Sequence, residues 1–338
     1  MHPNPHHQWH PMPAPTSRLP DMEFPPLDFS RLRLYPIRER PNKVHLDEFA
    51  SAWTPGGSFS QFCESLPRIL VGNDFRAVVG ATASAVRHGR PVVVMMGAHT
   101  IKCGLNPIFL DLMKRGVISA IALSGAGAIH DFELAYIGQT SEDVQRGLDD
   151  GSFGMIDETG RLMNRALADG VKQGLGAGRA LGEAIVTGQF RNRELSILHQ
   201  GIVGKIPVTV HIAIGTDIIH QHPTTDGCVL GEATYLDFQK FASVVAQLEG
   251  GVLFNIGSAV ILPELFLKAL TIARNLGHRV ENFTTITFDM IRQYRPAENV
   301  VRRPTHKGGQ GYYIIGHHEL LVPLWAAATL EQLNPHEC

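Results

Sequence analysis

The stretch VISAIALSGAGAIHDFE, residues 117–133, joins a strand pattern to a helix pattern through a run of small residues. Its apolar first half predicts a buried strand, and the Gly-Ala-Gly that follows allows a close turn of the backbone. A dinucleotide-binding turn has the pattern G-x-G-x-x-G, but here His130 stands at the third glycine position. The alternative is a plain turn in which Asp131 caps the helix that follows.

The same alternation of short apolar runs and longer amphipathic runs continues on both sides of this stretch. Strands are predicted at residues 91–97, 117–125, 207–215, 250–258, 281–289 and 311–316. Helices are predicted at residues 107–116, 263–277 and 318–333. This order predicts an α/β fold, a single large domain with a mostly parallel, Rossmann-like sheet covered by helices on both faces.

Composition limits the class of protein. The 338 residues are 44% hydrophobic and 18% charged with a formal net charge of -2, which indicates a globular, soluble chain without an electrostatic footprint for nucleic acid. No apolar run is long enough for a membrane helix. The four scattered cysteines and the absence of a secretory pattern favour a cytoplasmic location.

The chain is predicted to divide near residue 45. Residues 1–45 are rich in proline and histidine and predict an irregular N-terminal arm, whereas residues 46–338 carry the α/β pattern.

Polar or glycine-rich loops follow the predicted strands, where open α/β sheets bind their ligands. These loops are GAHTIKCG (97–104), SGAGAIHD (124–131), GTDIIHQHP (215–223), GSAV (257–260) and GHHE (316–319). Each loop has a functional interpretation as part of a binding site and a structural one, in which its polar groups satisfy its own backbone.

Several of these segments, in this order, resemble the deoxyhypusine synthase family over about residues 65–333. The segments are MMGAHTIKCGL, LSGAGAIHDFE, VTVHIAIGTD, LFNIGSAVILPE, FTTITFDMIRQYRPAEN and GYYIIGHHELLVPLWAAATL. The resemblance implies NAD as cofactor and a homo-oligomer, with a tetramer favoured and sites shared across a dimer interface. In that family NAD accepts hydride from spermidine, and an aminobutyl group passes through an enzyme lysine to a protein lysine.

The resemblance also implies site residues. For cofactor binding they are His99, Thr100, Gly125, Ala126, Gly127, Asp217, Gly257, Ser258, Thr284, His317 and His318. For catalysis they are His130, Asp131, Glu264, Asp289, Glu298, Lys307 and His317.

The sequence departs from the family at the reacting groups. Pro304 stands at the position of the nucleophilic lysine, and Lys307 lies three residues further on. His130 and Asp131 replace a pair of glutamates. The pattern therefore favours an NAD-dependent enzyme that oxidises a polyamine or another small amine, with aminoalkyl transfer left open, rather than one that modifies a protein lysine.

Two alternatives remain open from the sequence. The first is an NAD-binding or regulatory homologue that has lost catalysis. The second is a metalloenzyme built from His220, His222 and His317. Because no cysteine set and no H-E-x-x-H helix supports the second, we expect no metal ligands. The expected partner is a small amine, without nucleic acid and without a membrane.

Overall fold

The structure is a computed structural model that describes residues 23–334. The chain divides into two units, residues 1–45 and residues 46–338. The described part of the first unit contains two short 3-10 turns, Phe29–Arg31 and Ile37–Glu39. The α/β fold belongs to the second unit.

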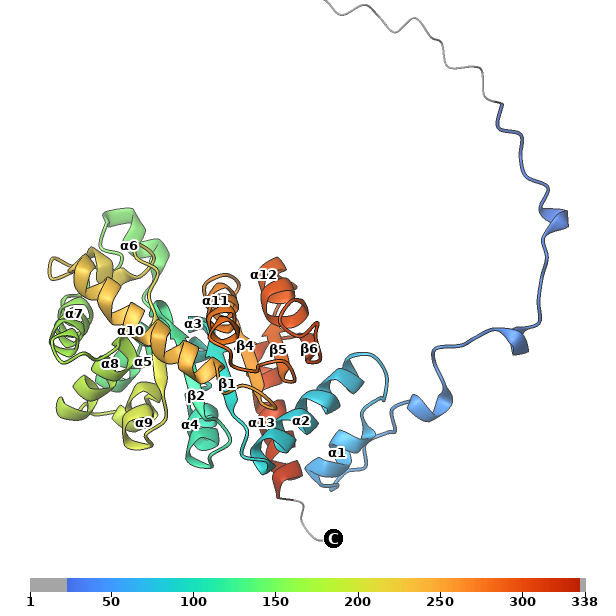
Figure 1. Cartoon of the computed structure of the whole chain (residues 1–338), viewed down its shortest axis with the longest axis horizontal. Helices are drawn as coiled ribbons and strands as arrows, with labels where there is room; N and C mark the ends of the chain where they lie inside the picture. Colours follow the sequence, from blue (N-terminus) through green and yellow to red (C-terminus); the bar gives the residue numbers. More distant parts are fainter. Residues whose placement is uncertain (1–22, 335–338) are drawn as a thin grey trace, which may run out of the picture. The chain divides into compact units, whose positions relative to one another are not determined.

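The second unit is built on a six-stranded parallel sheet with the order β3-β2-β1-β4-β5-β6 (Figure 1). The strands are β1 (Val92–Met96), β2 (Ala120–Ser124), β3 (Val208–His211), β4 (Val252–Ile256), β5 (Thr284–Asp289) and β6 (Gln310–Ile315). This arrangement confirms the predicted fold class. The strand order reverses between β1 and β4, which makes this pair the switch point of the sheet.

Alternate residues of the central strands β1, β2 and β4 enter two different hydrophobic cores, because successive side chains of a strand point to opposite faces. Val94 and Met96 belong to the core that also contains Trp325. Val93 and Met95 belong to the core that also contains Phe266. Both faces are therefore buried, and the strands read as continuous apolar runs.

Helices connect the strands and cover both faces of the sheet (Figure 1). They are α1 (Phe59–Ser65), α2 (Val71–Arg87), α3 (Ala98–Lys102), α4 (Asn106–Lys114), α5 (Gly125–Ile137), α6 (Val144–Asp150), α7 (Asp157–Val171), α8 (Ala177–Thr187), α9 (Ile197–Val203), α10 (Gly227–Val245), α11 (Ile261–Asn275), α12 (Tyr294–Pro296) and α13 (His318–Leu333). A 3-10 turn, η5 (Ile218–Gln221), follows β3, and α12 continues into a π-helix, η6 (Ala297–Arg302). Within residues 23–334 no helix is both long and apolar enough to cross a membrane.

Candidate functional site

The carboxyl ends of the parallel strands lie at one edge of the sheet, so the loops that follow them are neighbours. At the switch point the backbones after β1 and β4 approach closely. The amide of Gly97 donates to the carbonyl of Ile256 at 2.9 Å, and a Cβ atom on Gly97 would lie 2.2 Å from the carbonyl oxygen of Gly257. Gly257 itself has a φ of 64°, a left-handed conformation that favours glycine. Both positions therefore require glycine, and backbone lines this part of the edge.

His318 packs against the same point from the start of α13. A Cβ atom on Gly257 would lie 2.7 Å from Cε1 of His318. The His318 ring is buried, its Nε2 lies 3.2 Å from the carbonyl of Phe288, and its Nδ1 has no hydrogen-bond partner. Burial lowers the pKa of His318, so the ring is neutral at pH 7.

Two polar side chains lie at the first turn of α5. The Oγ of Ser124 accepts from the amide of Gly127 at 3.2 Å, and the carboxylate of Asp217 lies against Gly125. A Cβ atom on Gly125 would lie 1.9 Å from Oδ2 of Asp217. The carboxylate of Asp217 thus fills the space beside Gly125, the first of the three residues predicted to bind the cofactor at this turn.

Asp217 and His220 form a buried pair at this edge. Oδ2 of Asp217 and Nε2 of His220 lie 4.0 Å apart, and neither atom has a hydrogen-bond partner. The amides of Gly215 and Asp217 donate to Nδ1 of His220 at 3.1 and 3.3 Å, which places the proton of the neutral ring on Nε2. Burial raises the pKa of Asp217 to about 6, close to the range in which a base exchanges protons.

His130 lies half-buried on α5 within a chain of polar groups. Its Nδ1 is 2.5 Å from Oγ1 of Thr140, and that hydroxyl donates to Glu133 at 2.6 Å. The hydroxyl proton is committed to Glu133, so His130 donates through Nδ1 and keeps a lone pair on Nε2. Burial, with a smaller effect of Lys102, lowers the pKa of His130 to about 4, so this ring is neutral at pH 7.

Asp131 has a structural role. Its buried carboxylate accepts from the hydroxyl of Ser196, the amides of Ile197 and Leu198, and the side-chain amide of Asn106, at 2.6 to 3.1 Å. These contacts fasten the start of α9 to α5. The structure therefore does not support the catalytic role predicted for Asp131.

Two predicted site residues lie at the opposite edge of the sheet. Thr284 is the first residue of β5, and at ~3.3 Å per residue it is roughly 16 Å from the carboxyl end of that strand. Nζ of Lys307 lies 3.9 Å from Glu281, which precedes β5. Within one chain, neither residue therefore lies near the loops after β1 and β4, and the roles predicted for them stay predictions.

Three predicted carboxylates follow β4 and β5. Glu264 pairs with Lys268 and with Arg295 at 3.3 Å, and Glu298 pairs with Arg302 and with Arg303 at 3.5 Å. Asp289 ends β5, is buried, and accepts from the amide of Met290 at 2.8 Å. Glu264 and Glu298 are thus paired with cations of the chain itself, and Asp289 is the carboxylate that remains at the strand end.

The remaining predicted residues divide between backbone support and the surface. The hydroxyl of Thr100 is buried and donates to the carbonyl of Gly97 at 2.8 Å, and Oγ of Ser258 accepts from the amide of Leu262 at 3.3 Å. His99 and His317 are exposed. His220, His222 and His317 do not meet, because His222 pairs with Asp157 and Thr224.

No local pattern in the sequence points to the side-chain cluster formed by His99, Cys103 and Glu319. Cys103 reads as one of four scattered cysteines, and Glu319 reads as a favourable charge at the start of a helix. Buried polar side chains inside strands were also missed: Asn255, Thr285 and Thr287 each have an atom without a hydrogen-bond partner. In the sequence, such residues can be found as polar residues inside an otherwise apolar strand pattern.

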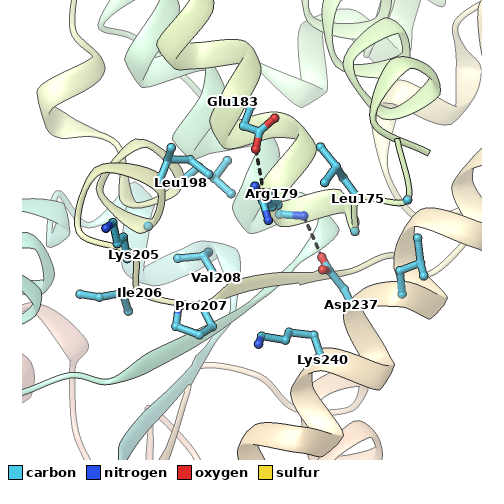
Figure 2. Close-up of a pocket in the computed structure, with 16 residues that line it drawn as sticks. Leu175, Arg179, Glu183, Leu198, Lys205, Ile206, Pro207, Val208, Asp237 and Lys240 are labelled. Carbon is cyan, nitrogen blue, oxygen red and sulfur yellow. Dashed lines mark hydrogen bonds and ion pairs between the residues drawn. The ribbon is translucent and has the colours of Figure 1, made fainter. Parts of the chain in front are cut away.

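A cavity of about 680 Å³ lies at the other side of the fold, beside the amino end of β3 (Figure 2). Its lining includes Arg179, Lys205 and Lys240, and Arg179 pairs with Glu183 at 2.8 Å. The buried carboxylate of Asp237 accepts from the amides of Gly178 and Val210, each at 2.7 Å. We place the candidate site at the carboxyl edge, because open parallel sheets bind ligands there and because Asp217, His220 and His318, which follow strands at this edge, each have a buried polar atom without a partner.

No family model and no curated protein matches the sequence. Solved structures are similar at low identity. A point mutant of AgrE bound to L-arginine has a TM-score of 0.50 at 16% identity, over 79% of this chain and 34% of the AgrE chain. AgrE in a ternary complex with ornithine and NAD+ has a TM-score of 0.49 at 15% identity, over 78% and 33% of the two chains. A deoxyhypusine synthase candidate from Entamoeba histolytica has a TM-score of 0.45 at 10% identity, over 83% and 96%.

This chain therefore spans about a third of the length of the AgrE chain. At these identities the likeness concerns the fold: an α/β protein with a Rossmann-like parallel sheet.

Proposed function

We propose that this chain is an NAD-dependent enzyme that oxidises a small amine or a polyamine at the carboxyl edge of its sheet. The observation that carries the proposal is the buried Asp217–His220 pair, with its two unpartnered atoms, which follows β3 at the carboxyl edge of the sheet and lies against the first turn of α5. Ligands of open parallel sheets bind at this place. The segments that resemble the deoxyhypusine synthase family supply these same loops.

A bound dinucleotide would find more space at the β1–β4 switch point than at the first turn of α5. Gly97 and Gly257 leave no side chain between the ends of β1 and β4, whereas the carboxylate of Asp217 already fills the space beside Gly125 in the first turn of α5. A bound NAD+ supplies a hydride acceptor. The residues that would hold it therefore lie in the loops that follow β1 and β4, since the amides of Gly97 and Gly257 already donate to the carbonyls of Ile256 and Phe288.

Asp217 is suited to hold the amine and to take its proton. Oxidation of an amine to an imine removes a hydride from carbon, which passes to NAD+, and a proton from nitrogen. Oδ2 of Asp217 is the free acceptor, since Nδ1 of His220 is already bonded to backbone amides. A carboxyl group with a pKa of about 6 is largely ionised at neutral pH and takes up a proton more readily than an ordinary aspartate.

The test combines binding and turnover. NAD+ binding is measured by calorimetry, and the full chain is incubated with NAD+ and a panel of polyamines and smaller amines while the absorbance of the reduced cofactor is followed. We expect NAD+ to bind and at least one amine to be consumed. Asp217→Asn should lose turnover by about 10²-fold or more, in the range of a removed general base. Asp149→Asn, a change at an exposed aspartate of α6, serves as the matched control.

The outcomes separate the two classes of function. Binding of NAD+ without consumption of any amine would favour a homologue that has lost catalysis. Absence of NAD+ binding would overturn the proposal itself.

A further inference from the structure

Three metal-ligating side chains from distant parts of the sequence meet beside the switch point. His99 lies on α3 and Cys103 directly follows that helix, so the two are four positions apart and share one helical face. Glu319 comes from the first turn of α13. One ligand atom of each residue lies within 4.8 Å of the other two, and Sγ of Cys103 is 3.6 Å from Oε2 of Glu319.

These separations suit a tetrahedral cation. With metal–sulfur bonds of about 2.3 Å and metal–nitrogen or metal–oxygen bonds of about 2.0 Å, neighbouring ligand atoms of a tetrahedron are roughly 3.3–3.6 Å apart. The Cys103–Glu319 distance therefore already matches one edge of the tetrahedron. His99 and Glu319 are exposed, so a small rotation of their side chains closes the remaining gaps without repacking the core.

The ligand types select the class of metal. A thiolate and an imidazole suit zinc and similar transition metals, whereas magnesium and calcium prefer oxygen ligands. Neighbouring histidines contact two of the three ligand side chains, His99 and Glu319. The ring of His318 packs edge-on against the ring of His99 at 5.7 Å, and Nδ1 of His317 lies 3.7 Å from Oε1 of Glu319, the oxygen that does not face Cys103.

We propose that His99, Cys103 and Glu319 bind a divalent transition metal of the zinc class, with a fourth coordination position left for water or a substrate atom. Three protein ligands are typical of zinc sites that act on substrates, whereas structural zinc sites use four. Binding replaces the thiol proton that Cys103 shares with Glu319 in the metal-free protein. The site goes beyond the proposed amine oxidation, because none of its three ligands depends on a bound dinucleotide.

The competing explanation is a metal-free surface cluster in which Cys103 donates a weak hydrogen bond to Glu319. Cobalt distinguishes the two, since a cobalt–thiolate bond gives a near-ultraviolet charge-transfer band and tetrahedral Co²⁺ gives visible bands. The full chain is treated with a chelator and titrated with Co²⁺. Four histidines lie among the first ten residues and can also bind Co²⁺, but they produce no thiolate band.

We expect a thiolate band that saturates at one equivalent, disappears in Cys103→Ser, and persists in Cys228→Ser, a change at an exposed free cysteine. His99→Ala should weaken the affinity by at least about tenfold, since even outer-shell changes typically cost that much. A wild-type protein without the band, or a band that survives Cys103→Ser, would overturn the proposal.

A second measurement needs no variant and therefore tests the site even if Cys103→Ser or His99→Ala fails to fold. In the wild-type chain, one equivalent of Zn²⁺ should slow alkylation of Cys103 and leave Cys228 reactive, as read by mass spectrometry of the two peptides. Equal alkylation of Cys103 with and without Zn²⁺ would count against the site. Neither measurement contains NAD+ or an amine, so its result is independent of the proposed oxidation.

Discussion

The carboxylate of Asp217 occupies the space directly above Gly125. A Cβ atom on residue 125 would lie 1.9 Å from Oδ2 and 2.8 Å from Cγ of Asp217. The loop after β3 is thereby packed against the first turn of α5. Glycine at 125 and aspartate at 217 therefore require each other.

Gly125→Ala should destabilise the protein, because the added methyl group displaces a buried carboxylate. We expect a loss of about 1–3 kcal/mol in the free energy of unfolding, measured with urea. Gly231→Ala in α10 is the matched control, since nothing lies within 4 Å of its Cβ position and alanine favours the helix interior. That control should gain roughly 0.5–1 kcal/mol. Equal effects of the two changes would contradict the contact.

Asp217→Asn should change how stability depends on pH. Burial raises the pKa of Asp217 to about 6 in the folded protein, so between about pH 4 and pH 6 the folded state keeps a proton that the unfolded chain has lost. Stability therefore falls as pH rises through this window, by on the order of 3 kcal/mol from this group.

The measurement is urea unfolding at a series of pH values. The asparagine variant should lose much of the fall between pH 4 and pH 6, and Asp149→Asn should retain it. Identical profiles for the wild type and Asp217→Asn would show that the carboxyl group titrates normally.

Asp131→Ala should be strongly destabilising, because it leaves buried donors of α9 and Asn106 unpaired. We expect a loss of at least about 3 kcal/mol in the free energy of unfolding. Asp143→Ala is a milder comparison, since it removes an exposed cap of α6 and should cost about 1 kcal/mol. A small effect at Asp131 would contradict the structural role assigned to it.

Lys307→Ala should leave amine turnover unchanged, because Lys307 lies at the amino edge of the sheet. Its exposed pairing with Glu281 at 3.9 Å should contribute less than about 1 kcal/mol to stability. Turnover is followed through the reduced cofactor, with Asp217→Asn as the variant that should lose it. Loss of turnover in Lys307→Ala would contradict this prediction and support the hypothesis that Lys307 takes part in the reaction.

Much of the fold was accessible from the sequence, because it depends on local patterns. The apolar runs at 91–97 and 117–125 became β1 and β2, and the segments 263–277 and 318–333 became α11 and α13 within about two residues. The polar loops after these runs were also expected at one edge of the sheet. Thr284 begins β5, within the strand predicted at 281–289, and so lies at the opposite edge of the sheet.

The sequence by itself determined the alternation of strands and helices, because periodicity and capping act over a few neighbouring residues. Only the tertiary structure decided what the polar side chains do. Asp131 caps α9, 65 positions away along the chain. Cys103 meets Glu319 across 216 positions. Such contacts depend on how the strands are ordered in the sheet and on where the helices pack, and no local pattern encodes that order.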